Sequence, residues 1–376
     1  MRKQNKKAIL SVIFLVAVFT LSVLFFVLPK SERSENEKRV LSEKPKLSFS
    51  SVADGTFSKE LDTYLADHFP FRDLFVGINS YAKLLLGENG SSGVYKCRDG
   101  YLISEQAKFD LKKAESNLKY MLDFSKKTKL PTSYVIVPSS GYIMDDVLPR
   151  FHTRFQDGEV LSLAKEMLPE DELIDLTESF EKNKSDVQIY YKTDHHLTSA
   201  GSLLAYGEIC KAKGIAESKF TLTKTVGDFY GTAYSKSGLW LTKGDSVEIR
   251  QSENANYKVK IKEGDNEIFS DSLYFEDHLG DMDKYPVFLD GNHALVTVEN
   301  GNCKNGKRLL MVKDSFAHCL ATFLAEDYEE ICMVDMRYFR GNLSQLIESE
   351  KLNELMFVYG VENTATSTDV VWLSLL

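Results

Sequence analysis

The sequence has few of the residues that mark small disulfide-bonded, zinc-binding or nucleic-acid-binding proteins. Only five of its 376 residues are cysteines and no Cys-x-x-Cys pair occurs, which excludes a zinc knuckle and a thioredoxin-type redox site. Basic residues number 46 against 55 acidic ones, so the formal net charge is −9. Because binding to nucleic-acid phosphates requires a dense basic surface, we expect no nucleic-acid partner. Hydrophobic residues still make up 43% of the chain, enough for the core of one large α/β domain or of two modest domains.

Long hydrophobic runs are absent from the chain after residue 30, but one occupies its start. Residues 8–28 carry no charge, and as a helix they would span roughly 30 Å, the thickness of the hydrocarbon core of a bilayer. The side chains before this run are basic, which places that end in the cytoplasm. The run is longer than the apolar core of a signal peptide and ends at Leu28-Pro29 without a small-x-small cleavage site. We therefore expect a single-pass anchor in the cell membrane with the bulk of the chain outside the cytoplasm. A cleaved signal peptide is the alternative.

Four short apolar runs in the remaining chain predict a buried β-sheet. Each run is continuous rather than alternating, which is typical of strands that are covered on both faces in a parallel sheet. Stretches of helical periodicity lie between them, so the order of elements indicates an α/β domain with a parallel sheet. The four runs are 133–138, 308–313, 330–335 and 354–359.

Changes of composition along the chain predict its domain boundaries. Residues 1–30 hold the cytoplasmic end and the anchor, 31–50 form a charged linker, and 51–376 form the α/β domain. Within this domain, 222–300 contains many short β-prone stretches separated by Gly, Asn and Asp, which we interpret as a β-rich insertion. Three further elements are expected: two helices with a kink at Phe69-Pro70-Phe71, a hairpin over 94–103, and an amphipathic helix over 109–130.

The first candidate for chemistry is the tripeptide Asp194-His195-His196, which contains two of the seven histidines. Thr198 is a suitable N-cap, so the tripeptide is expected on a loop that leads into a helix. A carboxylate two residues from an imidazole can hold the ring in one tautomer and stabilise its charged form, which is half of a hydrolytic triad. The same residue types also bind divalent metals, although no third or fourth protein ligand is evident, and a metal site is an alternative.

The second candidate is Ser315, which follows the apolar run 308–313 and precedes a helix expected over 316–325. A serine at such a turn presents its hydroxyl at the carboxyl edge of the sheet, where the backbone N–H groups behind it can form part of an oxyanion hole. Serine needs an adjacent base to become a nucleophile, and His196 would be that base. The alternative is that Ser315 only caps the helix.

Six short segments, taken in order, are more specific together than any one of them alone. They are Glu37-Lys-Arg-Val-Leu-Ser-Glu-Lys-Pro, Asp54-Gly-Thr-Phe, Asp67-His-Phe-Pro-Phe-Arg, Asp99-Gly-Tyr-Leu, Thr193-Asp-His-His and Lys313-Asp-Ser-Phe-Ala. The set, from about residue 37 to 359, resembles the bacterial DHHW family and the external catalytic proteins of alginate-type polysaccharide O-acetylation. This resemblance implies an SGNH-hydrolase-like three-layer α/β/α fold in which the Asp-x-His segment precedes the serine. It also implies a triad of Ser315 as nucleophile, His196 as base and Asp194 as the group that orients the base.

The resemblance further implies a basic residue near the serine, which here is Arg337, and we place His195 and His318 with it as substrate-binding residues. Three positions depart from the pattern of the group. Leu197 stands where the family has Trp, His318 stands where the group often has Asn, and Lys313 replaces the Gly of the SGNH block. An Asn-type oxyanion donor is therefore missing at position 318, and the departures affect substrate choice and rate more than the fold.

The function predicted from these features is serine acyl transfer, as an O-acetyltransferase or acetylesterase acting on cell-surface polysaccharide. We expect no cofactor and no metal. The resemblance implies a multi-span membrane O-acyltransferase as the partner that donates the acyl group. Two alternatives are a non-catalytic glycan-binding or scaffold protein on the same fold and a metal-dependent phosphoesterase. A metal-dependent phosphoesterase would need further Asp clusters. The only pair of adjacent aspartates in the segment from 135 to 191 is Asp145-Asp146.

Overall fold

The computed structural model describes residues 2–253, 255–264 and 266–375. The chain forms two compact units, each described by itself below. The smaller unit comprises 1–88 with 238–240, and the larger one comprises 89–237 with 241–376. The sequence-based boundaries, with a linker over 31–50 and one domain over 51–376, stay a prediction.

The smaller unit contains α1 and the two kinked helices expected from the sequence. Its first helix includes Ile9–Val27, a predominantly apolar stretch of 19 residues that is long enough to cross a membrane and is not buried. Phe71, with φ of 59°, marks the break between the next two long helices. The elements of this unit are α1 (Arg2–Val27), β1 (Arg33–Ser34), β2 (Arg39–Val40), α2 (Phe49–Ala53), α3 (Thr56–Asp67) and α4 (Arg72–Leu85).

Residues 238–240 complete the smaller unit. The Trp240 indole N–H donates to the backbone carbonyl of Asp73 at 2.9 Å. A Cβ atom at Gly77 would lie 2.9 Å from Cδ1 of Trp240, so only glycine lets the ring pack against α4 here. Residues 238–240 are therefore part of the N-terminal unit although they lie inside the sequence of the larger one.

The larger unit is built on an eight-stranded sheet in the order β11-β10-β12-β14-β13-β15-β6-β7. The five strands from β14 to β7 are parallel, and the other three pair antiparallel. The four apolar runs of the sequence form β6, β13, β14 and β15, all fully or almost fully buried. The strands are β6 (Thr132–Val137), β7 (Leu173–Ile174), β10 (Tyr257–Glu263), β11 (Asn266–Ser270), β12 (Leu295–Asn300), β13 (Arg308–Lys313), β14 (Glu330–Val334) and β15 (Glu354–Gly360).

The sheet is mixed rather than purely parallel, because the expected β-rich insertion contributes strands to it. Three strands of the segment 222–300 extend the parallel sheet beyond β14. In β10 the apolar residues are buried and the intervening lysines are exposed, an alternation that suits an antiparallel strand with one solvated face. The insertion also forms a separate antiparallel pair, β8 (Thr221–Phe229) with β9 (Asp245–Gln251).

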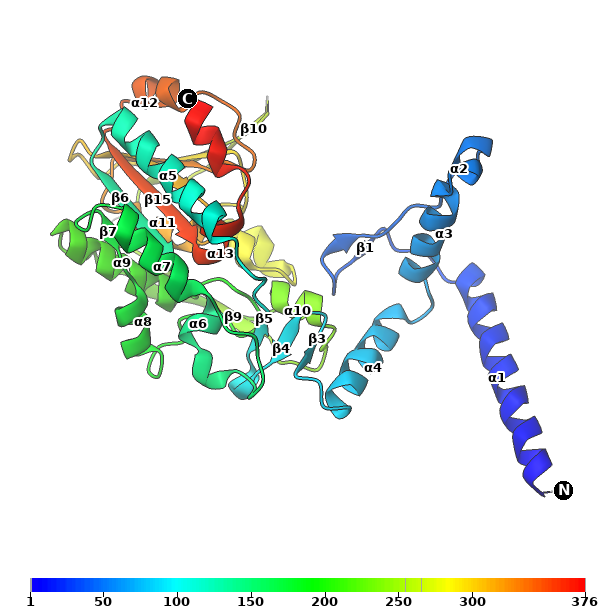
Figure 1. The fold of residues 1–376 in the computed structure, drawn as a ribbon. Coiled ribbons are helices and arrows are strands. Elements are labelled where there is room, and N and C mark those ends of the chain that lie inside the picture. The colour runs from blue at the N-terminus through cyan, green and yellow to red at the C-terminus, as the bar shows by residue number, and fades with distance from the viewer. Residues whose placement is uncertain (1, 254, 265, 376) are drawn as a thin grey trace. The chain divides into compact units, whose positions relative to one another are not determined.

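Helices cover both faces of the sheet and give the three layers expected from the sequence (Figure 1). Successive residues of β13 alternate between the two cores: Leu309 and Met311 pack on one side, and Leu310 and Val312 on the other. The first core includes α8 (Thr177–Asn183), α9 (Ser199–Lys213) and α11 (Ala317–Leu324). The second includes α5 (Leu111–Thr128), α7 (Asp157–Met167), α12 (Leu343–Ser349), α13 (Val361–Thr366) and the 3-10 helix Val370–Leu375.

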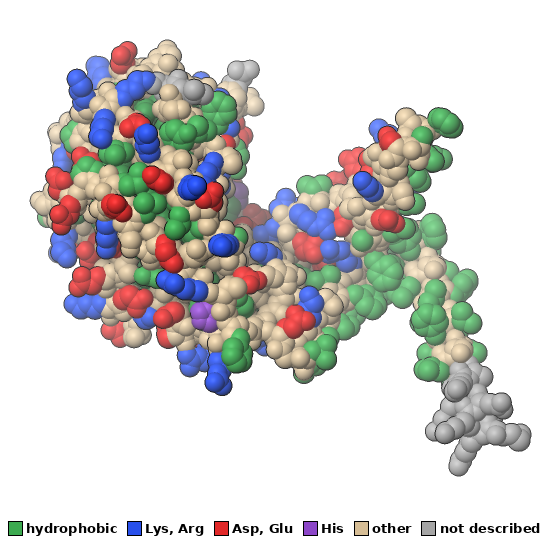
Figure 2. Space-filling view, viewed as in Figure 1, with side chains coloured by type: hydrophobic (Ala, Val, Ile, Leu, Met, Phe, Trp, Pro, Cys, Tyr) green, Lys and Arg blue, Asp and Glu red, His purple; other side chains and the backbone are tan. Residues whose placement is uncertain are grey.

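Smaller elements surround the carboxyl ends of the parallel strands, where ligands bind in α/β sheets. The predicted hairpin is confirmed: β4 and β5 pair antiparallel, with a 3-10 turn at Arg98–Gly100 between them. On the face drawn in Figure 2, acidic and basic side chains are interspersed over the larger unit. The smaller elements are β3 (Gly90–Ser91), β4 (Val94–Lys96), β5 (Leu102–Ser104), α6 (Ser140–Ile143), α10 (Thr232–Ser237) and 3-10 turns at Asp145–Val147, Glu276–Gly280 and Tyr285–Val287.

The core predicts the effect of a truncation at Phe357. This ring is 1% exposed, stacks on Tyr134 at a centroid distance of 5.3 Å and meets Phe124 edge-on at 6.4 Å. Phe357→Ala is expected to lower the free energy of unfolding by about 3–5 kcal/mol, because it leaves a cavity between β15 and α5. Phe151→Ala, at a ring that is 77% exposed, is expected to change it by less than about 0.5 kcal/mol. Urea unfolding followed by circular dichroism measures both, and equal effects would contradict the packing described here.

Candidate active site

The Asp194-His195-His196 tripeptide lies at the tip of a narrow loop in front of α9. Tyr190 and Leu197 form an isolated antiparallel bridge at the base of this loop. The N–H of Thr198 donates to the carbonyl of Ile189 at 2.8 Å, which closes the loop. The Thr198 hydroxyl accepts the N–H of Gly201 at 3.0 Å and caps the helix. The expected helix start is thus confirmed, and the loop conformation is fixed at both ends.

The buried carboxylate of Asp245, in the segment 222–300, supports this loop through hydrogen bonds. Asp245, the first residue of β9, accepts the backbone N–H groups of Lys192 at 2.9 Å and of Thr193 at 2.8 Å. It also accepts the Thr193 hydroxyl at 2.7 Å and the Gln188 amide at 3.0 Å. A buried carboxylate is stable only when such donors surround it, so the loop and β9 position each other.

Ser315 lies at the turn between β13 and α11, as the sequence predicted. Asp314 next to it stabilises the turn: one carboxylate oxygen accepts the N–H of Phe316 at 2.9 Å. The other oxygen accepts the N–H of Gly360 at 2.7 Å and the Asn363 amide at 2.8 Å. Burial raises the pKa of Asp314 above its ordinary value. Asp314 therefore holds the serine turn against the end of β15.

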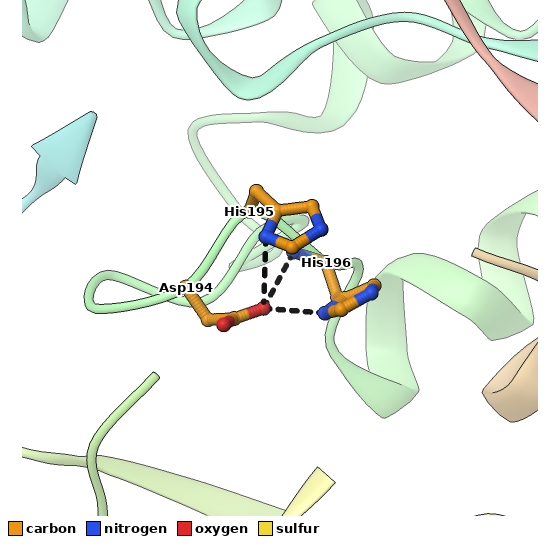
Figure 3. A group of neighbouring side chains, drawn as sticks. All are labelled: Asp194, His195 and His196. Atoms are coloured by element: carbon orange, nitrogen blue, oxygen red, sulfur yellow. Dashed lines mark hydrogen bonds and ion pairs between the residues drawn. The ribbon is translucent and has the colours of Figure 1, made fainter. Parts of the chain in front are cut away.

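The structure brings Asp194, His196 and Ser315 into one line of hydrogen bonds. Asp194 Oδ1 lies 2.5 Å from His196 Nδ1, and His196 Nε2 lies 2.8 Å from Ser315 Oγ. An ionised carboxylate only accepts hydrogen bonds, so Nδ1 carries the proton and Nε2 accepts the serine hydroxyl. The three residues are 3%, 6% and 9% exposed, so the line is shielded from water. Figure 3 shows the Asp194 carboxylate facing both histidines of the loop.

Thr232, at the start of α10, satisfies the second oxygen of Asp194. Its N–H and hydroxyl donate to Asp194 Oδ2 at 2.7 and 2.9 Å. The Thr232 hydroxyl also lies 2.8 Å from Nδ1 of His195, which fixes the orientation of that ring. A Cβ atom at Gly231 would lie 2.1 Å from Cβ of Asp194, so this approach requires glycine. Burial raises the pKa of Asp194, but the charges of His196 and His195 and the hydrogen bonds lower it well below its usual value.

Aromatic rings hold the His196 imidazole from the side. Tyr285 stacks on it at a centroid distance of 3.8 Å with an interplanar angle of 9°. The hydroxyl of Tyr285 donates to the backbone carbonyl of Ser315 at 3.0 Å. Phe316 meets the His196 ring edge-on at 5.5 Å. The ring of the base is therefore immobilised between the insertion and the serine turn.

All six residues that the sequence analysis selected line one pocket of about 650 Å³. Ser315, His196 and Asp194 form part of its wall together with His195, His318 and Arg337. Apolar side chains complete the wall and provide a surface for the uncharged part of a ligand. These apolar residues include Leu102, Val137, Phe155, Pro286 and Val361.

Comparison with known proteins identifies the relatives of this fold and site. The model of the DHHW protein family matches residues 173–334, a segment that includes the tripeptide loop, the insertion and the serine turn. The predicted DHHW resemblance is confirmed. Among curated proteins, none matches the sequence.

Several solved structures are similar to this chain. A DHHW family protein from Eubacterium siraeum has a TM-score of 0.63 at 18% identity, covering 76% of this chain and 95% of its own. Bacillus cereus PatB1, solved with a sulfonyl adduct, has a TM-score of 0.62 at 22% identity, covering 73% and 96%. The O-acetyltransferase domain of Pseudomonas putida AlgJ has a TM-score of 0.49 at 13% identity, covering 75% and 97%. At these identities, the first two establish a shared α/β fold.

Behind Ser315 lies a buried network of charges. The Lys313 ammonium lies 3.2 Å from Asp335 Oδ2 and 2.8 Å from Nε2 of His318. Arg337 donates to both oxygens of Asp335, at 2.9 and 2.6 Å, and to Oδ1 of Asn292 at 2.9 Å. Burial raises the pKa of Asp335, but Arg337 and Lys313 bring the pKa below its usual value. Arg337 therefore reaches the pocket while it neutralises a buried acid.

The metal alternative has a geometric basis in the same loop. Asp194, His195 and His196 each offer a ligand atom, and these atoms lie within 4.8 Å of one another. Both nitrogens of His196 are already engaged, one with Asp194 and the other with Ser315. A metal bound by His196 would replace one of these two hydrogen bonds, so the described arrangement suits a proton-transfer base better than a metal ligand.

Three supporting residues of the DHHW-like site were not found from the sequence. Thr232, Asp245 and Tyr285 lie inside the segment interpreted as an insertion, at positions without a recognisable motif. Hydrogen bonds to Asp194 and to the loop, and a ring stacked on His196, reveal them only in three dimensions.

The support of the loop by Asp245 predicts a local loosening on its removal. Asp245→Ala leaves the N–H groups of Lys192 and Thr193 without their acceptor, at about 1–3 kcal/mol for each buried donor. Amide hydrogen exchange over 190–198 is expected to accelerate. Glu248→Ala, on the same strand but paired with Arg250, is the matched control and is expected to leave that loop unchanged. Unchanged exchange in the Asp245 variant would contradict the proposed support.

Proposed function

We propose that this chain is a serine-dependent acyl-transfer enzyme with Ser315 as nucleophile, His196 as general base and Asp194 as the group that orients the base. The observation that carries the proposal is the continuous line of hydrogen bonds from Asp194 through His196 to Ser315 on the wall of a pocket. Nucleophilic serine requires this arrangement: a base within hydrogen-bond reach and a third group that fixes the tautomer of the base.

In the proposed reaction, Ser315 Oγ attacks the carbonyl carbon of an acyl ester while His196 Nε2 takes the hydroxyl proton. The tetrahedral intermediate collapses, the alcohol leaves with the proton from His196, and an acyl-Ser315 ester remains. A hydroxyl of the acceptor, deprotonated by His196, then attacks this ester and restores the free serine. No hydrogen bond of the described residues uses the backbone N–H of Ser315, which is therefore available to the oxyanion.

The substrate class we propose is the O-acetyl group of an extracytoplasmic polysaccharide. It is supported by the resemblance to polysaccharide O-acetylation proteins and by the apolar segment Ile9–Val27, which as an anchor would hold the enzyme at the cell surface. Cytosolic acyl donors would then not reach the site directly, so a multi-span membrane acyltransferase is the proposed source of the acyl group. Transferase and esterase activity share the acyl-enzyme and differ in whether water or a sugar hydroxyl accepts the group.

The proposed anchor makes a prediction about the mature protein. Ile9–Val27 is long and apolar enough to span a bilayer, so the full chain is expected in the membrane fraction and is expected to resist a carbonate wash. The intact mass of the purified protein should include residues 1–30. A mass that begins after this segment would identify it as a cleaved signal peptide instead.

The test of the chemistry is hydrolysis of p-nitrophenyl acetate by the full chain in detergent micelles. Ser315→Ala and His196→Ala are each expected to lower kcat by at least about 10³-fold, because the remaining triad residues cannot replace either group. Ser202→Ala, at a buried serine outside the pocket, is the matched control and is expected to keep the wild-type rate. A sulfonyl fluoride is expected to add to Ser315 and to no residue of the Ser315→Ala variant, as measured by peptide mass spectrometry.

Different outcomes favour the alternatives. Loss of activity with a chelator and its return with a divalent metal would favour the metal site of the tripeptide over the triad. A wild type without Ser315-dependent hydrolysis and without sulfonyl labelling would contradict the acyl-enzyme, and would leave a non-catalytic glycan-binding protein as the better account.

A further inference from the structure

His318 is a buried pocket residue that the triad does not use. It lies in the first turn of α11, three residues after Ser315, and its backbone N–H donates to the Ser315 carbonyl at 3.3 Å. The side chain is 1% exposed and forms part of the wall of the pocket that holds the triad. Its ring is tilted by 33° against Tyr285, the same ring that stacks on His196.

The surroundings of His318 determine which of its nitrogens carries the proton. Nε2 lies 2.8 Å from the ammonium of Lys313, which is itself 1% exposed and paired with Asp335. An ammonium group has three donors and no acceptor, so Nε2 must accept the hydrogen bond. The single proton of the neutral imidazole then lies on Nδ1.

Charge and burial keep this imidazole neutral. Burial lowers the pKa of His318 well below its ordinary value, and the charge of Lys313 lowers the pKa further. Burial also lowers the pKa of Lys313, but the carboxylate of Asp335 opposes that change and favours the ammonium form. His196, Arg337 and His293 also act on the His318 ring, and each lowers its pKa.

The second nitrogen of the ring has no hydrogen-bond partner in the described part of the chain. Nδ1 of His318 is buried and is without an acceptor among the described residues. A buried donor that is left unpaired costs about 1–3 kcal/mol, and such exceptions in folded proteins call for an explanation. His318 also lines the pocket that holds Ser315, so a ligand bound there is a candidate for the missing acceptor.

We propose that the Nδ1–H of His318 donates a hydrogen bond to the carbonyl oxygen of the acyl group attacked by Ser315, and that Lys313 fixes the tautomer that makes this possible. This inference rests on the proposed acyl-transfer function and adds a second oxyanion donor to the backbone N–H of Ser315. His318 is thus a catalytic residue, and Lys313 is a positioning residue that acts through it. A neutral donor on a buried part of the pocket wall stabilises the negative charge that develops on the carbonyl oxygen, and the donor keeps its proton.

The first experiment separates a donor in the transition state from a packing role. In p-nitrophenyl acetate hydrolysis, His318→Phe is expected to lower kcat by about 10²-fold with KM changed less than about threefold, since the lost bond forms mainly in the transition state. His318→Asn, which keeps an amide donor, is expected to retain kcat within about tenfold of wild type. Thr322→Val, one turn further along α11 and outside this pocket, is the control for packing of the helix.

Three results would overturn one or the other of two claims, the donor role of His318 and the proposed function. Wild-type kcat in His318→Phe, with the loss in Ser315→Ala intact, overturns the donor role of His318 and leaves the triad in place. A raised KM with unchanged kcat overturns it as well, because it assigns His318 to ground-state binding. Absence of Ser315-dependent turnover together with absence of sulfonyl labelling at Ser315 overturns the proposed function itself, and the donor role falls with it.

A second measurement tests the tautomer in the wild type and does not depend on the folding of a His318 variant. In the full chain labelled with 15N-histidine, the His318 ring is expected to show a protonated Nδ1 and an unprotonated Nε2 at neutral pH. Lys313→Met is expected to shift this ring towards the Nε2–H form and to lower kcat as His318→Phe does. An Nε2–H tautomer or a charged ring in the wild type would overturn the inference.

Discussion

The site depends on one buried carboxylate, that of Asp194, which must keep its charge without contact with water. Four hydrogen bonds make this possible: two from His196, through its backbone N–H and its ring, and two from Thr232. Removing a single donor would leave a charge that the interior cannot solvate, so the donors and the carboxylate stabilise each other's positions. The orientation of the His196 ring follows from this constraint, because the ring contacts Asp194 through one nitrogen and Ser315 through the other.

The two halves of the site have different supports. The serine turn is part of the sheet: β13 leads into it, and Asp314 ties it to the end of β15. The histidine loop belongs to no strand of that sheet, and the segment 222–300 supports it through Thr232, Asp245 and Tyr285. That segment also adds antiparallel strands next to β14, so it connects the rigid sheet to the loop that carries the base.

The sequence predicted the parts of the fold that depend on local pattern. Continuous apolar runs identified four strands of the sheet, and the Thr198 cap located the start of α9. Two short segments identified Asp194, His196 and Ser315 as candidate site residues. The mixed character of the sheet could not be predicted from the sequence. The patterns of β10 and β12 are equally consistent with a separate β-rich insertion and with strands that extend the central sheet, and only their pairing partners decide between the two. Thr232 and Tyr285 contact residues that are distant in sequence. The tautomer of His318, whose Nδ1 has no partner among the described residues, depends on a contact with Lys313 that only the fold creates.

The separation of the histidine loop from the serine turn has a consequence for how the protein is made. Nδ1 and Nε2 of His196 meet groups that lie 2 and 119 positions away along the chain, and the supporting segment lies between them. During synthesis, a chain that has been extended only through α9 contains Asp194 and His196 but lacks both Ser315 and Thr232, which hydrogen-bond to them in the folded protein. A complete site requires long-range closure of the sheet, which is slow compared with local helix formation. The complete line of hydrogen bonds from Asp194 to Ser315 thus forms only after the parallel strands that follow α9 have joined the sheet.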